Sequence, residues 1–155
     1  MAFRLESPSF KDGDRIPSRF TCDGQDLSPA LRWSDPPSGT QSYALLCDDP
    51  DAPGRIFVHW VLFNIPPSPM ELSEGLPAGG TLPNGARQGV TDFGRTGYGG
   101  PCPPSGVHRY FFKLYALSRP LDLPPGVTKS QVEKAMGSLI LGEARLVGRY
   151  SRTVS

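Results

Sequence analysis

Eighteen prolines and eighteen glycines are spread along this 155-residue chain and separate short apolar runs from one another. Proline removes a backbone donor and ends helices, whereas glycine favours turns, so this spacing disfavours long regular helices. Short apolar runs between turn residues are typical of strands joined by loops. The sequence therefore predicts a mainly β fold, and its length fits one domain over residues 1–155 with a substantial core.

Four segments have the composition of strands. Residues 55–65 carry β-branched and aromatic side chains on both faces, which predicts a central strand covered on both sides. Residues 41–47 predict a strand that ends at an acidic Asp-Pro-Asp turn, and residues 144–150 predict a last strand. In a strand over residues 108–117, the two-residue period places His108, Tyr110, Phe112 and Leu114 on one face and Arg109, Phe111, Lys113 and Tyr115 on the other.

One helix is expected, over residues 128–143. Thr128 is a suitable N-cap and Gln131 completes a capping box. Prolines restrict residues 1–40 to loops and short edge strands, and residues 66–107 should be mostly loop with one short helical turn near residues 70–74. The apolar stripe of the expected helix consists of Val132, Ala135, Met136, Leu139 and Ile140.

The charge balance and the hydropathy pattern exclude several classes of partner. Sixteen basic and fifteen acidic residues are well mixed and give a formal net charge of +1, without the basic stripe of a nucleic-acid-binding protein. No apolar run approaches the length of a membrane span, so integral membrane contact is not expected. The first residues lack the apolar middle of a signal peptide, which makes a cytoplasmic location the expectation.

The three cysteines, Cys22, Cys47 and Cys102, are an odd number without a Cys-x-x-Cys pair. This pattern predicts neither a disulfide framework nor a zinc site. Free cysteines are usually buried, so we expect three buried thiols, with one disulfide bridge as the alternative.

The chain's two histidines each lie beside an unusual run of residues. The first run is Asp48–Pro53, followed by His59, and the second is Gly97–Pro101, followed by His108 and Tyr110. Together they supply acids, imidazoles, a phenol and a glycine-rich turn whose backbone N–H groups are expected to be free to face a ligand. If the two runs meet in space, they form a small polar pocket suited to an anionic head group.

Each feature taken alone has a simpler structural interpretation. Asp and Pro are common turn residues, a histidine in an apolar strand is usually a core residue bonded to a carbonyl, and many glycine runs are only turns. The combination favours a binding pocket because all these groups fall at strand ends. Imidazolium and N–H groups attract phosphate while Asp repels it, so the pocket should favour a protonated phosphate or a zwitterion whose ammonium faces an Asp.

The two runs resemble the two signature regions of the phosphatidylethanolamine-binding proteins, and residues 20–24 (Phe-Thr-Cys-Asp-Gly) resemble the opening of the bacterial and archaeal branch of that family. The resemblance spans nearly the whole chain. It implies an antiparallel β-sandwich of two sheets with a small anion pocket at one end. The ligand-binding residues that it implies are Asp49, Asp51 and Pro53 in one wall, His59 in the floor, Gly100 and Pro101 in the rim, and His108 and Tyr110 in the opposite wall.

The function implied by this resemblance is non-enzymatic binding of a phosphate-like or phosphoethanolamine-like anion, with no cofactor, metal or catalytic residue. The anion would be a free small molecule or a group displayed on a protein partner such as a kinase or a protease. The resemblance also implies a homodimer, although the sequence itself shows no dimer interface.

Two other functions remain open. The chain has no Gly-x-Ser-x-Gly elbow, but His59, His108 and one of the two aspartates could hold a metal or act as an acid–base pair in phosphoester hydrolysis. Alternatively, residues 66–107 could make the protein a scaffold or an inhibitor that acts through its surface loops, independently of the pocket.

Overall fold

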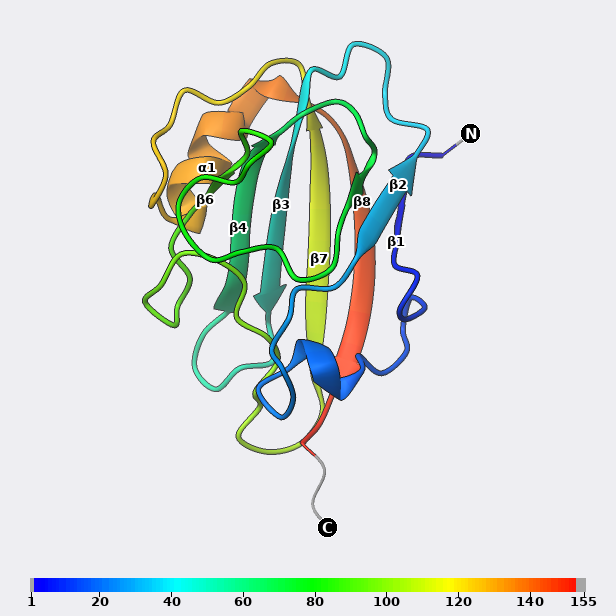
Figure 1. Ribbon diagram of the computed structural model, residues 1–155, viewed down its shortest axis with the longest axis vertical. Coiled ribbons are helices and arrows are strands. Elements are labelled where there is room, and N and C mark those ends of the chain that lie inside the picture. Colours follow the sequence, from blue (N-terminus) through cyan, green and yellow to red (C-terminus); the bar gives the residue numbers. More distant parts are fainter. Residues whose placement is uncertain (1, 153–155) are drawn as a thin grey trace.

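The computed structural model describes residues 2–152 of the chain. In this range, two antiparallel sheets and one short helix are joined by loops (Figure 1). The larger sheet has the strand order β6-β4-β3-β7-β8 and the smaller sheet the order β1-β2-β5, so the expected mainly β fold is confirmed. The elements in chain order are β1 (Arg4–Glu6), the 3-10 turn η1 (Ser18–Phe20), β2 (Leu31–Ser34), β3 (Ser42–Asp49), β4 (Phe57–Ile65), β5 (Glu71–Leu72), β6 (Arg87–Gln88), β7 (His108–Leu117), α1 (Lys129–Met136), the 3-10 turn η2 (Gly137–Leu139) and β8 (Ile140–Tyr150).

The larger sheet has a core on each face. On one face, Trp33 of β2 belongs to the same buried cluster as Leu45 of β3. On the other face, Val132 and Met136 of α1 are buried in a cluster with Leu46. All eight residues of β3 are therefore buried, and Figure 1 shows α1 beside β4 and the β1–β2 pair beside β8.

The central strands agree with the sequence patterns and differ at their ends. β4 is covered on both sides as expected, since Leu62 lies in one core and Val61 in the other. β7 has the predicted bounds, and its His108-to-Leu114 face is buried. β3 continues to Asp49, two residues beyond the expected strand end at residue 47, because Asp48 and Asp49 pair with β4. Asp49 therefore lies at the buried end of a strand and not in an exposed turn.

The predicted helix is too long at its C-terminal end. Its capping box is present, with Thr128 Oγ1 accepting from Gln131 N at 3.2 Å and Gln131 Oε1 accepting from Thr128 N at 2.9 Å. The helix stops at Met136, because Gly137 adopts a positive φ of 31°, and the chain then passes through η2 into β8. Ile140 pairs with β7 and is 40% exposed, so it is not part of the buried stripe.

The expected helical turn near residues 70–74 is also wrong. Glu71 and Leu72 form strand β5, which pairs with β2 through Arg32 and Leu31. Within residues 2–152, no helix has the length and apolar character needed to cross a membrane.

A buried ion cluster attaches α1 to the larger sheet. Asp48 is 2% exposed, and its Oδ2 lies 2.9 Å from Lys129 Nζ and 3.4 Å from Lys113 Nζ. The two lysines come from the helix and from β7, so one carboxylate joins three elements. This cluster lies on strand positions that point away from the site described next.

Candidate functional site

A cavity of about 300 Å³ opens where the C-terminal end of β3 meets the beginnings of β4 and β7. These strands are antiparallel neighbours, so the two signature runs reach the same end of the sheet. The cavity is lined by Asp49, Ala52, Pro53, Arg55, Phe57, His59, Phe93, Cys102, Pro103, Pro104, His108 and Tyr110. Both histidines thus lie in one hollow, as the sequence argument required, and whether it binds a ligand remains a prediction.

Asp49 and His108 form a buried pair in the wall of the cavity. His108 Nδ1 lies 2.6 Å from Asp49 Oδ2, and both side chains are less than a tenth exposed. The other carboxylate oxygen accepts the backbone N–H of Asp51 at 2.7 Å. With both oxygens engaged, Asp49 fixes the orientation of the His108 ring, so Nε2 is the His108 ring nitrogen left for a ligand.

His59 is held in a single tautomer by the chain that crosses above it. Its Nδ1 donates to the carbonyl of Gly99 at 2.7 Å, since a carbonyl can only accept. Burial lowers the pKa of His59, and the Gly99 carbonyl offsets this only in part. His59 is therefore a neutral imidazole near pH 7, and its Nε2 can accept a hydrogen bond.

Acidification is expected to destabilise the protein through His59. The unfolded imidazole, with an ordinary pKa of 6.5, takes up a proton that the folded state resists, so stability is complete above that pH and is lost as pH falls through the lowered folded pKa. Urea denaturation in a phosphate-free buffer should show a loss between about pH 7 and pH 5 that is smaller in His59→Gln. Equal losses in the two proteins would contradict a neutral, buried His59.

The hydroxyl of Tyr110 is a polar atom buried in the cavity wall without a partner. Tyr110 is 1% exposed, and its Oη makes no hydrogen bond within residues 2–152. Its ring lies edge-on to His59, with centroids 5.1 Å apart, and roughly parallel to His108 at 6.5 Å. Burial, with the Asp49 charge second, raises the pKa of this phenol far above its usual value, so it stays a neutral donor.

Asp51 does not line the cavity. Its carboxylate makes a forked contact with Arg109, at 2.9 Å to Nε and 2.8 Å to Nη2, and the same group accepts the Arg109 backbone N–H. These bonds lower the pKa of Asp51 to about 2. The expected pair of pocket acids is thus reduced to Asp49, while Asp51 links the first signature run to the start of β7.

Gly100 and Pro101 are buried and do not line the cavity. The expectation of free N–H groups in this run is wrong for Gly99, whose N–H donates to His59 O at 3.0 Å, and for Gly100, whose N–H donates to Asp26 Oδ1 at 2.8 Å. Pro101 O accepts from Cys22 N at 3.1 Å. The glycine run therefore positions His59, and the N–H groups of Gly99 and Gly100 are not available to a ligand.

Gly100→Ala is expected to destabilise the protein by about 1–3 kcal/mol, the usual range for overpacking. A Cβ at this position would lie 2.2 Å from the carbonyl oxygen of Phe20 and 2.9 Å from Thr21 Cα, and neither backbone atom can move aside cheaply. Chemical denaturation measures the change. A variant as stable as the parent would mean that the segment is not packed against η1 as described.

Sequence reasoning missed the aromatic and cationic groups of the cavity. Phe93 packs edge-on against both His59 and Phe57, with centroids 5.3 and 4.8 Å apart. Arg55 also lines the cavity and forms an ion pair with Asp92 at 2.8 Å. Phe93 and Arg55 come from loops whose return to the site is set by tertiary contacts, and Asp92-Phe93-Gly94 stood out only as part of the family resemblance.

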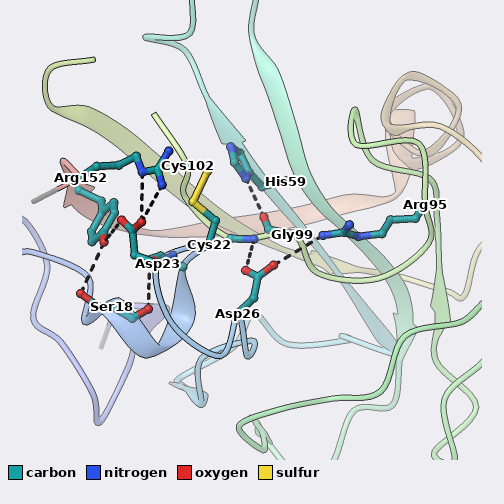
Figure 2. Close-up of a disulfide and its surroundings, with 12 residues drawn as sticks. Ser18, Cys22, Asp23, Asp26, His59, Arg95, Gly99, Cys102 and Arg152 are labelled. Carbon is teal, nitrogen blue, oxygen red and sulfur yellow. Dashed lines mark hydrogen bonds and ion pairs between the residues drawn. A yellow bond between two sulfur atoms is a disulfide. The ribbon is translucent and has the colours of Figure 1, made fainter. Parts of the chain in front are cut away.

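The expectation of three buried thiols is wrong. Cys22 and Cys102 form a disulfide, with Cα atoms 5.4 Å apart (Figure 2). Cys47 is a buried free thiol, as expected. The bridge joins positions 80 residues apart, so it follows from the fold and not from local spacing. Cys102 also lines the cavity.

The arrangement does not favour the proposed metal triad. Within residues 2–152, no group of three or more His, Cys, Asp or Glu side chains is placed to hold a metal ion. Asp49 and His108 direct their polar atoms at each other, and His59 Nδ1 is occupied by Gly99.

Comparisons with known proteins give a consistent picture. A family model described as phosphatidylethanolamine-binding protein matches residues 6–151. A UPF0098 protein of Methanothermobacter thermautotrophicus is 55% identical over 148 residues, which cover 96% of this chain and 98% of that protein. LppC of Mycobacterium tuberculosis, which is named as a lipoprotein, is 44% identical over 94% of this chain and 71% of its own length.

A solved structure has the same fold. The crystal structure of YbcL from E. coli, described as a new member of the mammalian PEBP family, superposes with a TM-score of 0.91. Its sequence is 34% identical, and the match covers 99% of this chain and all of that one, at 100%. The similarity extends over both sheets and includes the end of the larger sheet where the cavity lies.

Proposed function

Because this chain belongs to the phosphatidylethanolamine-binding protein family, we propose that its cavity binds a small anion that carries a phosphate group, without chemical turnover. The candidate ligands are inorganic phosphate and phosphoethanolamine-like head groups. The proposal rests on the geometry between His59, His108 and Tyr110.

The observation that carries the proposal is the unpartnered hydroxyl of Tyr110. A buried hydroxyl without a partner costs about 1–3 kcal/mol, and proteins keep such groups mainly where a ligand or water completes them. The ring that carries this hydroxyl packs against both imidazoles, each with Nδ1 already engaged. One phosphate oxygen accepting from Tyr110, and others meeting the Nε2 atoms, would satisfy all three side chains.

The electrostatics favour a protonated phosphate over the dianion. Asp49 adds a negative charge to the wall, and its pairing with His108 compensates that charge only when the imidazole is protonated. His59 is neutral and can accept a hydrogen bond from a phosphate O–H. Arg55 also lines the cavity with an exposed side chain, is paired with Asp92, and adds a cation to the lining.

The apolar part of the wall limits the size of the ligand. Phe57, Phe93, Pro53 and Pro103 surround the polar groups in a cavity of about 300 Å³, which is at the small end of ligand sites. A single phosphate or phosphoethanolamine group fits such a space. Phe93 is 38% exposed and Pro104 is exposed, so the mouth is also accessible to an anion carried on a larger molecule.

Calorimetric titration with phosphate tests the proposal. Binding should weaken as pH rises from about 6 to about 8, because the phosphate loses its second proton, and the dianion is repelled by the Asp49 charge and can no longer donate to His59. Phosphoethanolamine should bind as well, since its ammonium can face Asp49. Absence of binding at millimolar phosphate, or a flat profile between about pH 6 and pH 8, would contradict the proposal.

A variant of one of these residues also tests the hydrolase alternative. The Asp49–His108 hydrogen bond would suit a general base, so phosphoester turnover that disappears in His108→Asn would replace binding as the function. A scaffold that acts through residues 66–107 would instead keep partner binding in that variant.

Partners and assembly follow from the family and remain proposals. We expect the anion to be free or displayed on a protein partner such as a kinase or a protease, and we expect a homodimer. Sedimentation of the purified protein tests the dimer, for which the monomer mass is 16.8 kDa.

The redox state of the disulfide in cells tests the cytoplasmic location expected from the sequence. Disulfides persist mainly in oxidising compartments, and LppC is named as a lipoprotein. Alkylation of thiols in intact cells before lysis distinguishes the cases. Free Cys22 and Cys102 would support the cytoplasm, whereas a fully formed bridge would point to an oxidising compartment.

A further inference from the structure

We propose that the Cys22–Cys102 disulfide is a redox-sensitive tie that holds one wall of the cavity in place, so that its reduction weakens phosphate binding. The inference rests on the proposed function of the cavity and adds a means of regulating it. Cys102 lines the cavity, together with the next two residues, Pro103 and Pro104. Cys22 does not line the cavity and belongs to the loop after η1.

The Cys22 side of the bridge is firmly anchored (Figure 2). Its neighbour Asp23 accepts from Tyr150 Oη at 2.6 Å and forms an ion pair with Arg152 at 3.0 Å. Thr21, the residue before Cys22, is buried and donates its hydroxyl to Ser18 O at 2.8 Å. The loop that carries Cys22 is therefore attached to η1 and to the end of β8 by contacts that do not depend on the disulfide.

The Cys102 side has few other attachments. Upstream of Cys102, the chain is fixed at Gly100 by Asp26 and at Pro101 by the N–H of Cys22. Downstream, no hydrogen bond joins residues 102–107 to any other part of residues 2–152, and two of these residues are prolines without an N–H. Between Pro101 and His108, the disulfide is thus the one covalent or hydrogen-bonded attachment in the described chain.

The bridge is also accessible. Cys22 is exposed and Cys102 is half-buried, and an exposed disulfide can be reached by a thiolate. A dithiol supplies the two electrons. Its first thiolate attacks the Cys22 sulfur and displaces the Cys102 thiolate, and its second thiolate then closes a cyclic disulfide and releases the Cys22 thiolate. The two protein thiolates take up protons as their environments dictate.

Reduction should release residues 102–107 and leave the sheets intact. The wall next to Tyr110 and His108 would then be in its binding position for only part of the time, and the apparent dissociation constant rises in inverse proportion to that fraction. A wall that is in position a tenth of the time weakens binding about tenfold.

The test compares the oxidised protein, the protein reduced with dithiothreitol and a Cys22→Ser variant. Dithiothreitol is uncharged, so it does not compete for the anion site, and Cys22→Ser cuts the tie without changing a residue that lines the cavity. Phosphate titration should show binding weakened about tenfold or more in the reduced protein and in Cys22→Ser. Dithiothreitol should not weaken it further in the variant. Hydrogen exchange at the amides of Ser105, Gly106 and Val107 should accelerate, while β3 and β7 stay protected.

Three results would overturn the inference: equal phosphate affinity in both redox states, unchanged exchange at residues 105–107, or loss of the whole fold on reduction, which would make the tie global and not local. Absence of phosphate binding in the oxidised protein would instead overturn the proposed function, together with the regulation that rests on it. The exchange measurement then still decides whether the disulfide holds the wall.

Discussion

Replacing Tyr110 with Phe is expected to weaken phosphate binding by roughly 10- to 100-fold, the usual effect of a hydrogen bond to a charged group. The same change should raise the free energy of unfolding by about 1 kcal/mol, because it removes a buried hydroxyl that has no partner in the described chain. Calorimetry and urea denaturation of the one variant measure both effects. A loss of phosphate affinity together with a gain in stability identifies a group that is kept for binding at a cost in stability.

Tyr98→Phe is the matched control for this prediction. Its hydroxyl already donates to the carbonyl of Phe20 at 2.7 Å, and Tyr98 does not line the cavity. The control should therefore lose about 1 kcal/mol of stability and keep its phosphate affinity. If Tyr110→Phe behaved like this control, Tyr110 would be a structural residue, and the main observation in favour of phosphate binding in the cavity would be lost.

Asp48→Asn should lower the free energy of unfolding by about 3 kcal/mol, near the lower end for breaking a buried pair. The substitution keeps the size of the side chain, leaves Lys113 without its counterion and leaves Lys129 with only Glu133, whose carboxylate is 4.0 Å away. Both lysines are partly exposed, at 17% and 24%, so they can regain some hydration, which places the cost near that end of the range. Urea denaturation measures the change.

Glu6→Gln makes the same carboxylate-to-amide change at an exposed ion pair with Arg32, where both side chains are at least half exposed. It should cost less than about 1 kcal/mol. Similar losses in Asp48→Asn and Glu6→Gln would show that the cluster does not hold α1 to the sheet. Phosphate binding by the folded Asp48→Asn protein should be unchanged, because Asp48 does not line the cavity.

The parts of the fold that the sequence predicted are those that local periodicity determines. The alternation from His108 to Leu114 identified β7 and its buried face, and the Thr128–Gln131 capping box identified the start of α1. The end of α1 was missed because Ile140 pairs with β7. β5 was missed because it exists only through its pairing with β2, and such long-range pairing has no local signal.

The site shows the same division between local and long-range information. The resemblance to a known family predicted that five residues line one cavity, and all five do: Asp49, Pro53, His59, His108 and Tyr110. Alternation in an extended segment would have turned Asp51 the same way as Asp49, but Asp51 instead accepts three hydrogen bonds from Arg109, which is distant in sequence. The disulfide was missed because an odd number of cysteines does not show which two meet across 80 residues.

A crystal structure of the protein soaked with phosphate would show whether the cavity holds the anion. We expect one phosphate in the cavity between His59 and His108, with an oxygen within hydrogen-bonding distance of Tyr110 Oη. An empty cavity at saturating phosphate, or phosphate bound only at surface arginines such as Arg109 and Arg145, would contradict it.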